Sequence, residues 1–257
     1  MRAFLIGLQF LTRISLVRQT EWTEEDFGRS VRYFPAVGAV LGLCYVAIMF
    51  AAVELTGGRL PTFYAALTFL LTVALTGGIH CDGFIDTFDG LFSGRDRERM
   101  LEIMKDSRVG AFGAVSFVTL ALMNVATLGE LARLSTTDFL SATFAMPIVG
   151  RLMMVFVIGL FPYARASGMG KAFAARTDGR AMIFSTVEAI ILLAPLMLIS
   201  GEIFLTALMC GLGAFMYAFY FGYYATKKLG GVTGDIYGAV ELQSELIFLI
   251  AFLLIRG

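Results

Sequence analysis

Long apolar runs alternate with shorter polar segments along the whole chain. A helix needs about 20 apolar residues to cross the hydrocarbon layer of a bilayer. The pattern therefore predicts an all-α fold, a polytopic transmembrane helical bundle. We expect seven membrane helices, at residues 36–55, 60–79, 109–130, 139–161, 181–200, 203–224 and 236–255.

The first residues have a pattern of their own. Phe4, Leu5, Leu8 and Leu11 recur at helical spacing. No small-residue cleavage site follows them, so we do not expect a removable signal peptide. The spacing predicts a short amphipathic helix, which either lies on the membrane surface or packs on the bundle.

Composition agrees with an integral membrane protein. Of the 257 residues, 58% are hydrophobic and 16% are charged, whereas soluble domains carry about 25% charged residues. The mean hydropathy is +0.80. We find no linker, low-complexity tract or internal repeat, so residues 1–257 are interpreted as a single domain. The net charge is zero, and this gives no indication of a nucleic-acid partner.

The basic residues are distributed unevenly between the two sides of the predicted bundle. One side, with the N-terminus and three long loops, holds 16 Lys and Arg residues, and the other holds 3. Cytoplasmic segments carry such an excess of Lys and Arg. We therefore expect a multi-pass protein of the cell inner membrane, with its N-terminus and its active site facing the cytoplasm.

The stretch HCDGFIDTFDG is unusual in so apolar a chain. Asp82, Asp86 and Asp89 lie four and three residues apart, so a helix would place them on one face. Like charges so placed repel one another, and a hard cation such as Mg²⁺ or Mn²⁺ would relieve the repulsion. Gly83 and Gly90 leave room for backbone or substrate to approach this face.

The same loop continues with a second acidic pair, Glu102 and Asp106, among interleaved bases. Acids that hold a metal beside bases that hold phosphate are what a phosphoryl-transfer site needs. The alternative is a solvated loop with salt bridges between residues four apart, which suits the run RDRER well. The bases are Arg95, Arg97, Arg99, Lys105 and Arg108.

Two single residues need a partner. His80 is the only histidine, and it is either a metal ligand or proton carrier or simply hydrogen-bonded at the membrane boundary. Arg151 lies inside the fourth predicted span, where an unpaired charge is costly. A carboxylate or a substrate phosphate would serve as its anionic partner.

Two further polar stretches fall on the same side as the acidic loop. In KKLGGVTGDIYGAVELQSE, Thr233 and the glycine backbone could cradle a phosphate, and Asp235, Glu241 and Glu245 enter the last predicted span. Intramembrane ionisable groups are candidate functional residues; the alternative is a glycine-rich turn with interfacial carboxylates. The loop at 163–180 could bind an anionic substrate or be an ordinary basic loop.

These motifs together resemble one family. The stretch TGGIHCDGFIDTFDGLFSGRDRERMLEIMKDSRVGAFG is similar to the signature of the cobalamin synthases, also called adenosylcobinamide-GDP ribazoletransferases. FLTRI, SVRYFPAVGAVLG, GMGKAF, TDGR and GGVTGDIYGAVELQSELIFL resemble that family in the same order. The resemblance extends over nearly the whole chain.

The resemblance implies a Mg²⁺-dependent membrane enzyme of vitamin B12 synthesis. Its substrates would be adenosylcobinamide-GDP and α-ribazole or α-ribazole 5′-phosphate, and its products adenosylcobalamin or the 5′-phosphate, and GMP. The metal ligands would be Asp82, Asp86, Asp89, Glu102 and Asp106. His80 and Asp106 are the catalytic candidates. The candidates for substrate binding are Arg95, Lys105, Arg108, Arg151, Thr233, Asp235 and Glu241. A homodimer is compatible with the sequence.

A weaker similarity links the acidic block to the CDP-alcohol phosphotransferases, in which an alcohol also attacks a pyrophosphate. Asp86, Asp89, Glu102 and Asp106 follow the order of acids in that motif, and Asp106 corresponds to its last acid. The match departs in detail, since Arg95 is displaced by one residue and Glu102 replaces an aspartate. A lipid-synthesis enzyme of that type and a secondary transporter are the alternative functions.

Overall fold

The computed structural model describes residues 2–17 and 23–257, which form helices joined by loops and contain no β-strand. This confirms the predicted all-α class. The helices are α1 (Arg2–Leu11), α2 (Glu24–Ser30), η1 (Val31–Tyr33), α3 (Phe34–Thr56), α4 (Pro61–Thr76), α5 (Ile79–Leu91), α6 (Arg97–Ile103), α7 (Ala111–Leu134), α8 (Thr136–Leu160), α9 (Met169–Ala174), α10 (Gly179–Leu193), η2 (Ala194–Leu198), α11 (Gly201–Leu229) and α12 (Gly234–Arg256).

Six helical segments in the described part of the chain are long and apolar enough to cross a membrane. The second predicted span differs from a simple helix, because α4 and α5 meet at an angle of 94°. Gly77 and Gly78 form the break, with left-handed φ angles of 65° and 74° that glycine adopts easily. The acidic stretch therefore forms a helix of its own, α5. The described residues contain six spans, or seven where the bent pair of α4 and α5 is counted as one broken span.

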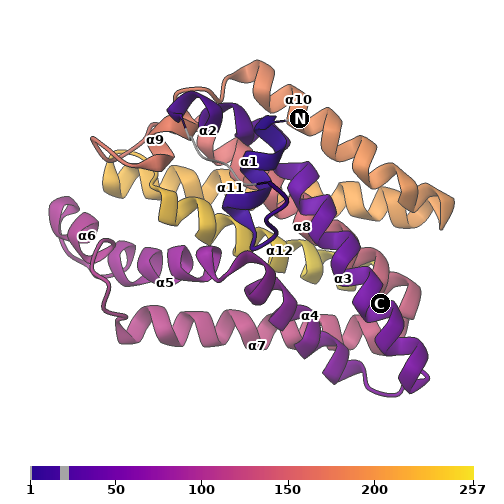
Figure 1. Ribbon diagram of the computed structural model, residues 1–257. Coiled ribbons are helices and arrows are strands. Elements are labelled where there is room, and N and C mark those ends of the chain that lie inside the picture. The colour runs from indigo at the N-terminus through magenta and orange to yellow at the C-terminus, as the bar shows by residue number, and fades with distance from the viewer. Residues whose placement is uncertain (1, 18–22) are drawn as a thin grey trace.

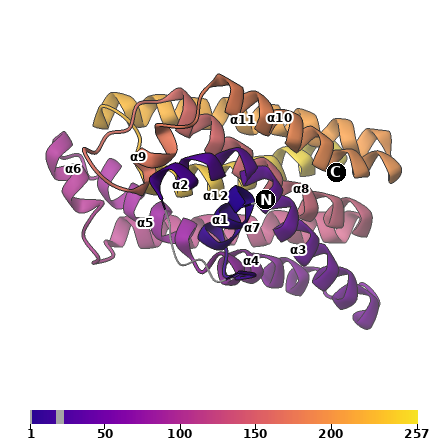
Figure 2. The same cartoon turned by 45° about the horizontal axis from the view of Figure 1, so that its top comes forward.

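The core of the bundle lies around α8 and α12, the most buried of the spans. Figures 1 and 2 show α4, α5 and α7 on one side of this pair and α10 and α11 on the other. Helix α3 packs on α8 at very short range, because a Cβ on Gly38 would lie 2.2 Å from the Pro147 carbonyl oxygen. Small residues at such crossings let helix backbones approach closely in membrane bundles.

The N-terminal amphipathic helix packs on the bundle, the second of the two predicted alternatives. Ile6, Leu8 and Leu11 of α1 are buried. The following segment crosses the break between α4 and α5, where the Arg13 amide donates to the Leu75 carbonyl at 2.7 Å. This contact places α1 beside the start of α5.

The long polar loops gather at one end of the molecule. Figure 1 shows α6, α9 and the turn between α11 and α12 at the same end of the bundle. The Arg97 side chain ties them together, donating to the carbonyls of Leu229 at 2.7 Å and Ala164 at 3.3 Å. The Val232 amide also donates to the Pro162 carbonyl at 2.8 Å. The three loops predicted to share one side therefore build one surface.

Candidate active site

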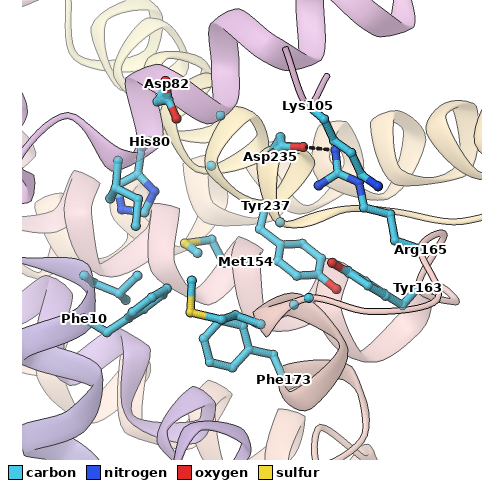
Figure 3. A pocket seen from close by; sticks show the side chains of 18 of the residues that line it. Phe10, His80, Asp82, Lys105, Met154, Tyr163, Arg165, Phe173, Asp235 and Tyr237 are labelled. Atoms are coloured by element: carbon cyan, nitrogen blue, oxygen red, sulfur yellow. Dashed lines mark hydrogen bonds and ion pairs between the residues drawn. The ribbon is translucent and has the colours of Figure 1, made fainter. Parts of the chain in front are cut away.

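A cavity of about 420 Å³ opens at this end of the bundle (Figure 3). It lies where α5 and α12 meet α1, α8, α9 and the loops after α6 and α8. The residues that line it are Phe10, Leu11, Ile79, His80, Asp82, Gly83, Lys105, Met154, Tyr163, Arg165, Ser167, Gly168, Met169, Gly170, Phe173, Gly234, Asp235, Tyr237 and Gly238.

Two glycines bring α5 and α12 together beneath the cavity. A Cβ on Gly83 would lie 2.8 Å from the Asp235 carbonyl oxygen, and a Cβ on Gly238 would lie 3.1 Å from the His80 Cα. The sequence predicted that either backbone or substrate would approach Gly83 closely, and the structure shows the backbone of Asp235 there. This approach brings the first turn of α12, with Asp235, beside the acidic face of α5.

The polar half of the cavity combines acids and bases from distant parts of the chain. The Arg165 guanidinium donates to the Asp235 carboxylate at 2.7 Å, and the Thr233 hydroxyl donates to the same carboxylate at 3.2 Å. Figure 3 shows Lys105 beside this pair and Asp82 at the same side of the cavity. Positive and negative groups therefore face one another across this half.

The other half of the cavity is apolar and aromatic. Figure 3 shows Phe10, Met154 and Phe173 gathered away from the acids, with Tyr163 and Tyr237 between the two halves. Phe10 and Phe173 meet edge to face, with ring centroids 5.4 Å apart. Burial raises the pKa of the Tyr163 phenol, so this hydroxyl stays protonated near neutral pH. Such a surface suits a flat, apolar ligand group.

The three aspartates of α5 have different surroundings. Asp82 is exposed to the cavity, and Asp86 is half-buried one turn further along. The negative charges of Asp82, Asp235 and Asp89 all act on the Asp86 carboxyl group. Asp89 instead accepts two backbone hydrogen bonds of 2.7 Å, from the amides of Gly110 and Gly113. It anchors the first turn of α7, and both of its oxygens are engaged.

The second acidic pair does not face the cavity. Glu102 is exposed and bonds to Arg99 at 2.8 Å, as expected for a solvated, charge-balanced helix. Asp106 bonds to the Arg108 guanidinium at 2.7 Å, and this pairing lowers the pKa of Asp106 to about 2. Arg108 and Arg95 are exposed. Of the bases predicted in this loop, the structure brings Lys105 to the cavity.

Arg151 has carboxylate partners, the first of its two predicted alternatives. It is fully buried and forms ion pairs with Glu241 and Glu245 of α12. The cluster links α8 to α12 inside the core and does not line the cavity. Thr233 is buried and caps α12, accepting from the Ile236 amide at 3.4 Å. Arg151, Glu241 and Thr233 thus have contacts within the protein and do not line the cavity, and their predicted contact with substrate stays a prediction.

His80 lines the cavity and is itself buried. Its Nε2 atom has no hydrogen-bond partner among the described residues. A buried polar atom without a partner is unusual, and this one belongs to a residue that borders the cavity. His80 therefore lies at the cavity, and its catalytic role stays a prediction.

The acids have the chemistry of a Mg²⁺ site without forming a closed cage. Within residues 2–17 and 23–257, no three His, Cys, Asp or Glu side chains are grouped so as to hold a metal ion. Mg²⁺ usually binds one or two carboxylates, substrate phosphates and water. Asp82 and Asp86 provide such carboxylates, and the negative charge concentrated around Asp86 would be relieved by a cation.

Sequence reasoning did not single out Arg165 or the aromatic residues of the cavity. Arg165 belongs to the loop at 163–180, for which binding of an anionic substrate was an open alternative. The remaining signal was weak, because Phe10, Phe173, Tyr163 and Tyr237 lie in four separate elements. Their common surface arises only when those elements pack together.

Comparisons with known proteins agree with the resemblance seen in the motifs. The family model described as cobalamin-5-phosphate synthase matches residues 3–253. A protein of Desulfitobacterium hafniense named adenosylcobinamide-GDP ribazoletransferase is 41% identical over 254 residues, covering 97% of this chain and 96% of that protein. Proteins of the same name from Fusobacterium nucleatum and Citrobacter koseri are 34% and 36% identical, covering 99% and 98% of this chain and 98% and 99% of their own lengths.

No solved structure matches this chain. The assignment therefore depends on the sequence comparisons, which extend over nearly the full length of the chain and of its relatives. The motifs that carry the resemblance include α5 and the first turns of α12, the two elements that meet at the cavity. The chain belongs to the cobalamin-5-phosphate synthase family.

Proposed function

We propose that this protein is an adenosylcobinamide-GDP ribazoletransferase. It joins adenosylcobinamide-GDP to α-ribazole, or to α-ribazole 5′-phosphate, giving adenosylcobalamin or its 5′-phosphate and GMP in the final steps of cobalamin synthesis. The observation that carries the proposal is the cavity, in which acids and bases occupy one half and aromatic side chains the other. The names of the relatives support the same activity.

The bases of the cavity bind the pyrophosphate of adenosylcobinamide-GDP. Arg165 and Lys105 come from different loops and reach the same polar half. Arginine offers a planar set of donors suited to phosphate, and lysine offers a compact positive charge. Asp235 holds the Arg165 guanidinium at 2.7 Å, so it orients this group before substrate binds.

We assign Mg²⁺ binding to Asp82 and Asp86, with Asp235 nearby. A bound Mg²⁺ would neutralise charge on the pyrophosphate and on the departing GMP. Asp89 supports the site indirectly, because its carboxylate holds the start of α7 against α5. Glu102 and Asp106, which pair with arginines outside the cavity, have no part in this scheme.

His80 accepts the proton of the attacking ribose hydroxyl of α-ribazole. Its Nε2 atom is unpartnered among the described residues and its ring lines the cavity. A positioned general base contributes about 10²- to 10⁴-fold to the rate. Asp106 is less suited, because its lowered pKa makes it a weak base and it does not line the cavity.

The enzyme works in the cell inner membrane with the cavity open to the cytoplasm. The surface that contains the cavity is built from the loops that carry the excess of Lys and Arg, and such loops are cytoplasmic. Described residues of a single chain line the cavity, and the homodimer stays a prediction.

A turnover assay tests the proposal. Purified protein in liposomes receives adenosylcobinamide-GDP and α-ribazole with Mg²⁺ or with EDTA, and GMP and cobalamin are followed by chromatography. We expect both products in equal amounts with Mg²⁺ and neither with EDTA. His80→Gln should lower turnover about 10²-fold or more, with little change in KM. Folded protein that forms no product under any metal condition contradicts the proposed activity.

A further inference from the structure

A second concave region lies apart from the candidate active site and shares none of its lining residues. It is a basic pocket of about 610 Å³ between α2, η1 and the start of α10. The lining residues are Arg29, Arg32, Ala175, Arg176, Asp178, Arg180, Ala181 and Phe184. We call it the arginine pocket; four of its eight residues are arginines.

Acidic groups near the arginine pocket do not balance its charge. Glu25 bonds to Arg29 at 2.7 Å and lies 3.5 Å from Arg176. Asp178 accepts a hydrogen bond of 2.9 Å from the Ala181 amide, as the cap of α10. Within the described residues, Arg32 and Arg180 have no carboxylate at ion-pair distance. The pocket therefore has unpaired positive charge that an anion could neutralise.

An apolar face begins directly beside the arginine pocket. Ile183, Val187, Ile190 and Ile191 of α10 are 67%, 51%, 43% and 65% exposed. Their spacing of three and four residues places them on one side of the helix. Exposed apolar side chains on a membrane-spanning helix face the hydrocarbon of the bilayer. Figure 2 shows α10 running away from the α2 end along the outside of the bundle.

We propose that the arginine pocket binds the headgroup phosphate of an anionic phospholipid. Arg180 lies one turn before the apolar face of α10, so a phosphate at Arg32 and Arg180 leaves the acyl chains beside Ile183 and Val187. Guanidinium groups suit phosphate because their donors are planar and weakly hydrated. Basic pockets beside membrane helices bind anionic lipid headgroups. A soluble phosphate would make the same ion pairs but would not use the apolar face.

Native mass spectrometry of the full-length protein in detergent tests this proposal. The protein is titrated with phosphatidylglycerol or with phosphatidylcholine of the same acyl chains, and separately with glycerol 3-phosphate as a soluble competitor. We expect saturable binding of one phosphatidylglycerol molecule per protein, and we expect that glycerol 3-phosphate does not displace it. The double variant Arg32→Gln/Arg180→Gln should bind it about thirtyfold more weakly, because each basic residue near an anionic lipid contributes about fivefold.

A matched control removes the same charge elsewhere on the surface. Lys227→Gln/Lys228→Gln also lowers the net charge by two, and these lysines lie over the rings of Tyr223 and Tyr224, outside the pocket. This variant should keep the phosphatidylglycerol affinity of the wild type. Arg32→Gln and Arg180→Gln are also made singly, with thermal unfolding to confirm that each protein is folded.

Three results would overturn the proposal. One is equal phosphatidylglycerol affinity in the wild type and in the folded arginine variants. Another is an affinity for phosphatidylcholine equal to that for phosphatidylglycerol, which would mean that the pocket does not distinguish lipids by headgroup charge. The third is displacement of the lipid by glycerol 3-phosphate at similar concentration, which would mean that the pocket takes soluble phosphates. None of these results bears on the turnover assay, so the two proposals can fail separately.

Discussion

Replacing Gly83 by alanine tests whether the close contact between α5 and α12 holds the active site in shape. The new Cβ would lie 2.8 Å from the Asp235 carbonyl oxygen and 3.1 Å from its Cα, whereas ordinary contact begins at 3.4 Å. Both neighbours are helix backbone and cannot rotate away. The two helices must therefore separate by about 0.6 Å at this point.

This separation acts on both stability and catalysis. Overpacking of this kind costs about 1–3 kcal/mol in unfolding free energy, and the better helix propensity of alanine offsets about 1 kcal/mol of it. Asp235 would move relative to Asp82 on the other helix. Misplacement of reacting groups by about 1 Å costs about 10²-fold in rate, so we expect kcat/KM to fall by about tenfold or more.

The assay compares Gly83→Ala with Gly213→Ala. Gly213 also lies in a membrane helix, α11, but a Cβ there would have no atom within 4 Å outside its own helix backbone. This control should be as stable as the wild type or up to about 1 kcal/mol more stable, with unchanged turnover. Full activity and stability in Gly83→Ala would refute the idea that tight contact of α5 with α12 shapes the site.

Three further substitutions separate the roles of the charged residues. Asp89→Ala should lower the unfolding free energy by about 1–3 kcal/mol, because two α7 amides lose their acceptor; faster amide exchange at the start of α7 checks this. Arg151→Met should cost about 3–5 kcal/mol by leaving buried carboxylates unpaired, and adding Glu245→Gln should recover part of that loss. Asp106→Asn should keep its turnover. Since Arg108 lowers the pKa of Asp106 to about 2, the stabilisation from this pair is complete above about pH 4 and is lost toward pH 2. Acid unfolding of Asp106→Asn should therefore depend less on pH in that range than that of the wild type.

Local patterns in the sequence determined the fold class and the position of the acidic helix. Apolar runs of about 20 residues predict membrane helices because the bilayer sets their length. The spacing of Asp82, Asp86 and Asp89 predicts one helical face because the helix repeat is constant. These features depend on near neighbours in the chain, and the structure confirms the all-α bundle. The motif order likewise indicated the family that the comparisons show.

The tertiary structure decided which partner each charged side chain has, because that depends on which helices pack together. The sequence pattern does not distinguish Asp82 from Asp89. In the structure Asp82 faces the cavity, whereas Asp89 accepts hydrogen bonds from two backbone amides at the start of α7. Arg165 and Asp235 are 70 residues apart and form one ion pair. Arg151 could have met a substrate phosphate, but the packing of α8 on α12 provides Glu241 and Glu245 instead. Periodicity cannot encode such contacts, since a repeat along one helix specifies a face and not the neighbour that covers it.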